Sequence, residues 1–295
     1  MANFIEIAFT GASFGAAFAL LALSINVIYS SSNVLNFAQG EFMMLGGMLG
    51  WALYSTGRTP YILAFVLVAL ICAVIGVVEY YLVVWPLLRR RAAVISIIVA
   101  TLGFSIVMRI TTALTMGRVE RFARPPLGED PVRVFGAALV PQSFVVLGVT
   151  AAALVALWLI YSRTTLGLAL RAAAFEVDGA RLMGIDVSKV RAATFAAGGA
   201  LAGIAGLLIS PLSFASPWVG LDFAIQGFAA AIIGGLGSWP GSIVGGATLG
   251  VFRSVMLRYV SPEWGNMFTL ALILLVLYVR PTGLFGERAA EAGTR

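Results

Sequence analysis

Long apolar runs alternate with short polar stretches over the whole chain. They lie at about 5–29, 34–55, 61–87, 94–115, 142–162, 192–210, 223–236, 240–259 and 266–279. The runs are continuous, unlike the alternating strands of a membrane barrel, and most approach the roughly 20 residues that a membrane-spanning helix needs. Because the last four are short or interrupted by glycine, eight or nine crossings both fit. The pattern predicts an all-α polytopic membrane protein with short or broken helices, in a single transmembrane domain over residues 1–295.

The composition agrees with this class and argues against several others. The chain is 60% hydrophobic and 11% charged, which is unlike a soluble domain of this size. In a membrane protein its net charge of +6 concerns loop orientation, so we expect no nucleic-acid partner. A single cysteine, Cys72, excludes an intrachain disulfide, and the lack of histidine removes the commonest general base and metal ligand. We therefore expect no enzyme activity, no metal and no cofactor on this chain.

The segment 36–47 places polar groups inside an apolar run. Two amides and a carboxylate fall within six residues, and each is costly in hydrocarbon unless a neighbour or a wet cavity satisfies it. If the segment is helical, Asn36, Gln39, Gly40 and Met43 share one face, while Glu41 points about 100° away from Gly40. These four residues are predicted to line a substrate pathway or to face a packed protein interior. Glu41 is a separate acid, with either a structural or a pathway role.

The loop 163–191 is basic, and its pattern predicts two short helices. Thr165 is placed to cap a helix over Leu166–Ala174. A second helix is expected over Glu176–Met183, with acids in its first turn and Gly184 as its stop.

An apolar knob stands on this otherwise polar loop. Leu182, Met183 and Ile185 form it, and such anchors suit a groove on a cytosolic partner. The alternative is a helix resting on the bilayer surface. The candidate coupling residues are Arg171, Glu176, Asp178, Arg181, Leu182, Met183, Gly184 and Ile185.

A glycine-rich stretch interrupts the apolar pattern at 223–246. It is not a dinucleotide loop, because Pro240 stands where glycine is required, and the only lysine, Lys189, lies in no P-loop. The chain therefore cannot hydrolyse ATP through a P-loop of its own. Two short helices joined by a break fit better, and the break is either a gate or a structural turn. Its candidate residues are Gly234, Gly235, Gly237, Ser238 and Gly241.

Basic residues predict the orientation in the membrane. Arg89–Arg91, the loop 163–191 and the tail from Arg280 share one side if the segment order is right. The positive-inside rule makes that side cytoplasmic, with the N-terminus outside and the C-terminus in the cytoplasm. The loop 116–141 argues the other way, because four arginines lie in it on the outer side.

A stand-alone channel or secondary transporter for a small polar solute is the alternative class. It would need coupling or selectivity charges within the spans, and Glu41, Glu79 and Arg109 are the clear candidates. Arg109 is expected to snorkel to the outer surface, and Glu79 to lie within reach of Arg89–Arg91.

Four stretches resemble the motifs of one transporter family. They are Asn36-Phe37-Ala38-Gln39-Gly40-Glu41, Gly167…Arg171-Ala172…Ala180…Gly184-Ile185, Gly234-Gly235-Leu236-Gly237-Ser238…Gly241 and Arg280-Pro281-Thr282-Gly283-Leu284-Phe285-Gly286. In this order they resemble the branched-chain amino acid-type permeases of ATP-binding-cassette (ABC) importers, and among these the shorter, H-type membrane subunit of high-affinity leucine transporters. One departure is Gln39, where the family often has histidine. Glutamine keeps a donor and an acceptor but does not titrate.

The resemblance implies a multi-pass permease subunit in a bacterial inner membrane. It would move branched-chain amino acids, or a related amide, urea or aromatic acid, inward from a binding protein. The implied partners are a second homologous permease in a heterodimer, two cytosolic ATPases and an extracytoplasmic substrate-binding protein, all in or against membrane lipid. The resemblance implies that ATP is bound by the ATPase partners, with no cofactor on this chain.

Overall fold

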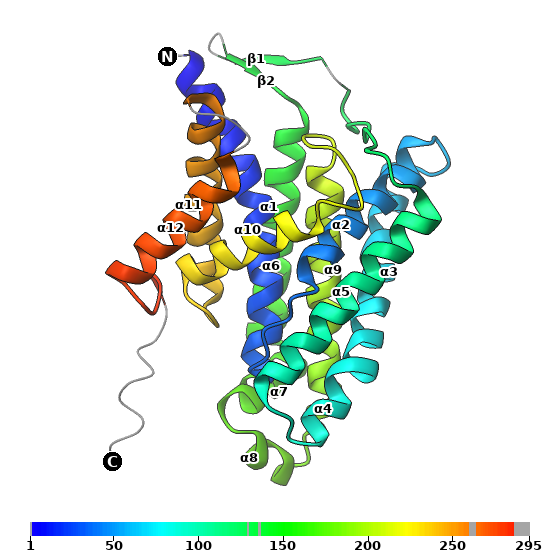
Figure 1. Cartoon of the computed structure of the whole chain (residues 1–295), viewed down its shortest axis with the longest axis vertical. Coiled ribbons are helices and arrows are strands. Elements are labelled where there is room, and N and C mark those ends of the chain that lie inside the picture. The colour runs from blue at the N-terminus through cyan, green and yellow to red at the C-terminus, as the bar shows by residue number, and fades with distance from the viewer. Residues whose placement is uncertain (1, 129, 135–136, 260–263, 286–295) are drawn as a thin grey trace.

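The computed structural model describes residues 2–128, 130–134, 137–259 and 264–285, most of them helical (Figure 1). The helices are α1 (Ala2–Ser32), α2 (Gln39–Gly50), α3 (Tyr61–Glu79), α4 (Trp85–Arg89), α5 (Val94–Met116), α6 (Gln142–Arg163), α7 (Thr165–Phe175), α8 (Val177–Leu182), α9 (Val187–Ile209), α10 (Gly220–Gly234), α11 (Trp239–Tyr259) and α12 (Gly265–Val279). Two π-helical segments continue them: η1 (Trp51–Ser55) after α2 and η2 (Tyr80–Val84) between α3 and α4. Two short strands, β1 (Val132–Val134) and β2 (Ala137–Leu139), pair antiparallel.

Five stretches of the described chain are long and apolar enough to cross a membrane. They are Ile5–Ser32, Tyr61–Arg89, Val94–Met116, Gln142–Arg163 and Val187–Ile209. The helices α10 and α12 are apolar but only 15 residues long each. This confirms the all-α polytopic class, with short helices among the long ones.

The long helices give the molecule two distinct ends (Figure 1). The N-terminal end of α1 lies near the β1–β2 strands, at the top of the view. The short helices α7 and α8 and the end of α4 lie together at the bottom. We call this lower end, with Arg89–Arg91 and the segment 163–191, the α7–α8 end.

Burial separates central helices from peripheral ones. The most apolar 18-residue stretch of α1 is 89% buried and that of α9 is 72% buried. In the spans that contain α3, α5 and α6, about a fifth of this stretch is buried. The peripheral helices expose large apolar side chains such as Ile62, Val99 and Val155. Such a surface suits lipid or another membrane subunit rather than water.

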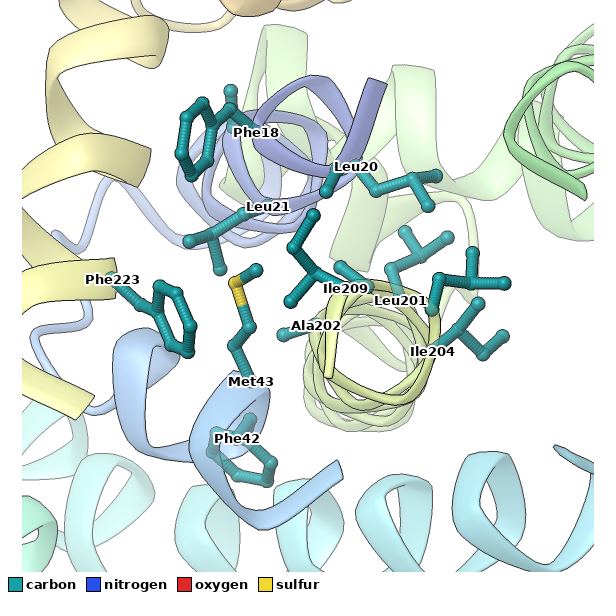
Figure 2. Close-up of a cluster of buried hydrophobic side chains, with 14 of the residues drawn as sticks. Phe18, Leu20, Leu21, Phe42, Met43, Leu201, Ala202, Ile204, Ile209 and Phe223 are labelled. Atoms are coloured by element: carbon teal, nitrogen blue, oxygen red, sulfur yellow. The ribbon is translucent and has the colours of Figure 1, made fainter. Parts of the chain in front are cut away.

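The central core joins α1, α2, α9 and α10 (Figure 2). In the close-up, Leu21 of α1 points toward Met43 of α2 and Phe223 of α10, and Ile209 of α9 lies beside Met43. Side chains from four helices that are distant in sequence thus fill one interior, which fixes α2 and α10 against the two central spans.

Glycines let α2 and α9 approach closely. A Cβ built on Gly206 would lie 1.7 Å from the carbonyl oxygen of Met43, and one on Gly46 would lie 2.0 Å from that of Gly203. Neither position has room for a side chain. The α2–α9 contact therefore depends on small residues on both helices.

The structure corrects some predicted boundaries. The expected span over 34–55 is not one helix, because residues 33–38 are irregular and α2 begins only at Gln39. The cap of α7 is Thr164 rather than Thr165, since its side chain accepts from the Gly167 amide at 3.1 Å. The second loop helix is shorter than predicted, at Val177–Leu182. The three-residue strands were not foreseen, because so short a stretch shows no clear alternation.

Candidate functional site

Asn36 lies just before α2, buried in the protein. Its Nδ2 donates to Oε2 of Glu79 on α3 at 2.9 Å, and its Oδ1 accepts from the backbone amide of Ala38 at 2.9 Å. The predicted shared helical face is therefore wrong for this residue, since Asn36 precedes the helix. Its amide instead ties the start of α2 to α3.

Gln39 has a partner on a different helix. Oγ of Ser24 on α1 donates to Oε1 of Gln39 at 3.3 Å, and Gln39 is fully buried. Asn36 and Gln39 therefore point to separate neighbours, and both are enclosed by this chain. The sequence left two alternatives for these amides, a substrate pathway or a packed protein interior. In the single chain they lie in a packed interior.

Glu41 forms the main buried ion pair of the described residues. Arg109 of α5 donates to Oε1 of Glu41 through Nε at 3.0 Å and also through Nη2. The Glu41 side chain is 2% exposed and that of Arg109 is 22% exposed. The prediction that Arg109 snorkels away from the interior is therefore wrong.

The other oxygen of Glu41 abuts the start of α10. A Cβ on Gly220 would lie 2.1 Å from Oε2 of Glu41, so a side chain at this position would displace the carboxylate. A carboxylate beside a helix N-terminus is favoured by the helix dipole. Glu41 thus brings together α2, α5 and α10.

Glu79 was expected to approach Arg89–Arg91, and the structure contradicts this. Within the described chain it accepts from Asn36 and forms no ion pair with those arginines. It is fully buried at the point where α3 changes to the π-helical η2, a local irregularity often found at functional sites.

Gly40 and Met43 serve helix contacts. A Cβ on Gly40 would lie 2.1 Å from the Gly220 carbonyl oxygen, and Met43 is fully buried in the core. The described residues contain no group of three histidine, cysteine, aspartate or glutamate side chains that could hold a metal ion.

The glycine-rich break lies between α10 and α11, and Asn26 of α1 holds it. The Asn26 Nδ2 donates to the Ser238 carbonyl oxygen at 3.2 Å and to Oγ of Ser242 at 2.7 Å. Its Oδ1 accepts from the Gly237 amide at 3.0 Å. Gly235 and Gly237 have φ values of 107° and 82°, which favour glycine. Sequence reasoning missed Asn26, although a lone amide in the run 5–29 was a usable signal.

The tail motif packs on the same break. The Leu284 amide donates to the Ile233 carbonyl oxygen and the Phe285 amide to that of Gly234, both at 2.9 Å. Gly283 has a φ of 78°, and a Cβ there would lie 2.5 Å from the Ile232 carbonyl oxygen. Gly241 also meets Gly234 closely, with a built Cβ 2.3 Å from its carbonyl oxygen. Two motifs distant in the sequence therefore form one structural unit.

The α7–α8 end carries three large apolar side chains that are almost fully exposed. Leu182 is 89% exposed and Met183 82%, and Phe175 at the end of α7 is 93% exposed. The predicted apolar knob of Leu182, Met183 and Ile185 is therefore corrected: Ile185 is partly buried, and the apolar knob consists of Phe175, Leu182 and Met183. Phe175 was missed because it was placed outside both predicted helices.

A small core supports the knob. Ile185 packs against a cluster of buried side chains, and Gly184, with a φ of 80°, turns the chain after α8. Those buried residues are Leu170, Ala173, Ala180, Val187 and Val190. The knob therefore stands on an ordered base.

The polar residues of this segment are mostly solvated. Arg181 pairs with Asp178 at 3.0 Å, and both side chains are well exposed. Glu176 immediately precedes α8 without capping it through its side chain.

The side chain of Asp186 caps α9. Hydrogen bonds from the backbone and side chain of Lys189 hold the pKa of the Asp186 carboxyl below its usual value. Arg171 lies over the Tyr161 ring, 5.3 Å from its centroid.

Known proteins resemble this chain over almost its whole length. Residues 7–277 match the family described as branched-chain amino acid transport system / permease component. The high-affinity branched-chain amino acid transport system permease protein LivH of Salmonella typhimurium is 32% identical over 305 residues, covering 98% of this chain and 97% of the relative. A probable branched-chain amino acid transport permease protein LivH of Methanocaldococcus jannaschii is 30% identical, covering 90% and 88%.

A solved structure shares the fold. It is PsaBC from Streptococcus pneumoniae in complex with Fab, with a TM-score of 0.51 and 13% identity, covering 94% of this chain and 92% of that one. At this identity the likeness concerns the arrangement of helices alone.

Proposed function

The chain belongs to the family of permease components of branched-chain amino acid transport systems, and we propose that it carries branched-chain amino acids inward across a bacterial inner membrane. It is a membrane-spanning permease of the ABC importer type. Near-full-length similarity to permeases named for this substrate supports the solute class. The alternative substrates are related small solutes, namely amides, urea and aromatic acids. Transport assays with each of them would distinguish these from branched-chain amino acids.

A stand-alone channel or secondary transporter fits less well. Such a protein needs uncommitted charges along its route. Here Glu41 and Arg109 pair with each other, and Glu79 is bonded by Asn36. These contacts give the three intramembrane charges structural partners.

Coupling to ATP hydrolysis is assigned to the α7–α8 segment. The observation that carries this assignment is the apolar knob, Phe175, Leu182 and Met183, exposed on an ordered base. Burial of apolar anchors in a partner's groove is the usual basis of such docking. In the proposed complex two cytosolic ATPases bind ATP, one of them on this segment, and Arg181 faces an acidic rim.

The remaining partners follow from the family. A second homologous permease would pair with the exposed apolar surface, and an extracytoplasmic substrate-binding protein would deliver the solute. The N-terminus would lie outside and the C-terminus in the cytoplasm, since the α7–α8 end carries Arg89–Arg91 and the basic segment 163–191.

The pathway role of the segment 36–43 remains part of the proposal. Asn36 and Gln39 lie next to Gly40, where α2 contacts the first turns of α10, a helix of only 15 residues. Movement of α10 away from Gly40 would open the enclosed amides to the partner permease. Replacing both amides, as in Asn36→Leu with Gln39→Leu, should then stop transport without preventing assembly, and retained transport would return them to a structural role.

Affinity purification of the full chain from its own membranes tests the function directly. In mild detergent the chain should bring a P-loop ATPase with it, and the reconstituted complex should take up leucine only with ATP and a binding protein. Leucine uptake by the chain alone, without ATP and without a recovered ATPase, would refute the proposal.

A further inference from the structure

A groove on the outside of the bundle remains unassigned. It has a volume of about 440 Å³ and lies among α1, α6, α7 and the start of α11. This volume falls in the range of small-molecule sites. None of the permease features described above uses it, apart from Arg171 at its rim.

The groove is apolar along most of its length. Leu23 of α1, Leu154 and Trp158 of α6 and Ile243 of α11 line this part. From Leu154 to Ser162 the α6 axis rises about 12 Å, which suits a stretch of extended acyl chain. Only 17% of the apolar window of α6 is buried within the chain, so its outer face is available to lipid.

One end of the groove is polar and positively charged. Arg171 lines it, and among the described carboxylates none forms an ion pair with this guanidinium. The Ser162 hydroxyl also lines it and is buried without a hydrogen-bond partner in the described chain. No acidic side chain lies in the lining. The two groups together offer charge-assisted and neutral hydrogen bonds to an anion.

Aromatic rings mark the depth of this polar end. Tyr161 and Trp239 are in contact, with ring centroids 4.3 Å apart and planes tilted by 42°, and Arg171 lies over Tyr161. Tyrosine and tryptophan favour the level of lipid headgroups, and α6 ends one residue after Ser162. The polar end therefore matches the height of a phosphate, with the apolar part at the height of acyl chains.

We propose that this groove binds one anionic diacyl phospholipid, with its phosphate on Arg171 and Ser162 and an acyl chain along Leu23, Leu154 and Ile243. Basic pockets between membrane helices recognise such headgroups through the same combination. The inference rests on the groove itself and holds whatever solute the permease carries.

Native mass spectrometry of the delipidated full chain tests the site. Titration with phosphatidylglycerol should give tighter binding than phosphatidylcholine of the same acyl chains. Arg171→Gln should weaken phosphatidylglycerol binding about tenfold, the loss expected for one charge-assisted contact, and Ser162→Ala should weaken it less. Arg163→Gln is the matched control, because Arg163 is a neighbouring arginine outside the lining. It should change binding by less than about twofold.

Two further arms separate the lipid from other occupants. Ile243→Trp should fill the apolar part and reduce binding of both lipids, while glycerol phosphate should not compete because it lacks acyl chains. Equal effects of Arg171→Gln and Arg163→Gln, or equal affinity for the two lipids, would overturn the proposal. Loss of the bound lipid from the assembled transporter would also overturn it, since a second membrane subunit would then cover the groove.

Discussion

At the scale of single residues, the Glu41–Arg109 pair gives the sharpest expectation. Arg109→Gln leaves a carboxylate that is 2% exposed without its cation, and breaking a buried pair costs about 3–5 kcal/mol. Glu41→Gln should cost less, because Arg109 is 22% exposed and reaches solvent more readily. The thermal midpoint in detergent should therefore fall further for Arg109→Gln than for Glu41→Gln.

The double variant provides the control for this pair. Glu41→Gln with Arg109→Gln should be more stable than Arg109→Gln alone, since no unpaired charge is then buried. If the double variant loses as much stability as the two single variants together, the pair does not couple α2 to α5.

Asn26 gives a second residue-scale prediction. Asn26→Ala removes three hydrogen bonds, each worth about 0.5–1.5 kcal/mol. Of the three groups only the Gly237 amide is left without another partner among the described residues, since Ser238 and Ser242 stay bonded to each other. Thermal stability should fall and the break should become susceptible to protease. Ser30→Ala is the control, because the only hydroxyl bond of Ser30 among the described residues is to Val27 of its own helix. Similar losses for the two variants would contradict a role for Asn26 in fixing the break.

The sequence identified the polar residues within the apolar runs but not their hydrogen-bond and ion-pair partners. Glu41, Glu79, Arg109, Asn36 and Gln39 were all identified as intramembrane polar groups. Only Glu79 was given partners, Arg89–Arg91, by nearness in sequence. The actual pairs, Asn36–Glu79 and Glu41–Arg109, are 43 and 68 residues apart. Asn26 binds groups more than 200 residues away. Hydropathy carries no information on such pairings, which depend on how the helices pack.

At the scale of elements, the α2–α9 contact is open to a glycine test. Gly206→Ala places a Cβ 1.7 Å from the Met43 carbonyl oxygen, so the helices must separate, at a cost of about 1–3 kcal/mol or more. Gly148→Ala on α6 is the matched control, because a Cβ there meets no atom within 4 Å. The control should be neutral or slightly stabilising through its higher helix propensity. Equal midpoints for the two variants in a thermal melt would contradict the close contact.

Elements were predictable where the apolar run was long. The runs 61–87, 94–115 and 142–162 correspond to Tyr61–Arg89, Val94–Met116 and Gln142–Arg163. The prediction of one helix over 34–55 was wrong. Hydropathy does not indicate that residues 33–38 are irregular and bring Asn36 to Glu79. The segment after Arg163 was predicted as two short helices, since capping residues and Gly184 are local signals.

At the scale of the whole molecule, orientation is testable by cysteine labelling. Cys72 is fully buried, so its background labelling should be low. A membrane-impermeant maleimide added outside intact cells should label Thr56→Cys, in the loop directly after η1, and leave Ala93→Cys at the α7–α8 end unlabelled. Both residues are exposed, so accessibility is matched. Labelling of Ala93→Cys from outside would invert the proposed topology.

The central claim is that an ATPase drives this permease through the apolar knob. Burial of Leu182 and Met183 in a partner is worth on the order of 3–6 kcal/mol before ordering costs. The variant with Leu182→Ala and Met183→Ala should still insert and pair with the second permease. The matched control has Val94→Ala and Ile95→Ala, which truncates two exposed apolar side chains at the same end, on α5.

The most direct measurement compares ATP-driven leucine uptake and ATPase recovery for these two double variants in one preparation. The knob variant should lose about tenfold or more of both, while the α5 control keeps them near the level of the unaltered chain. Full uptake and full ATPase recovery by the knob variant would contradict the account and leave α7 and α8 as helices lying on the membrane surface.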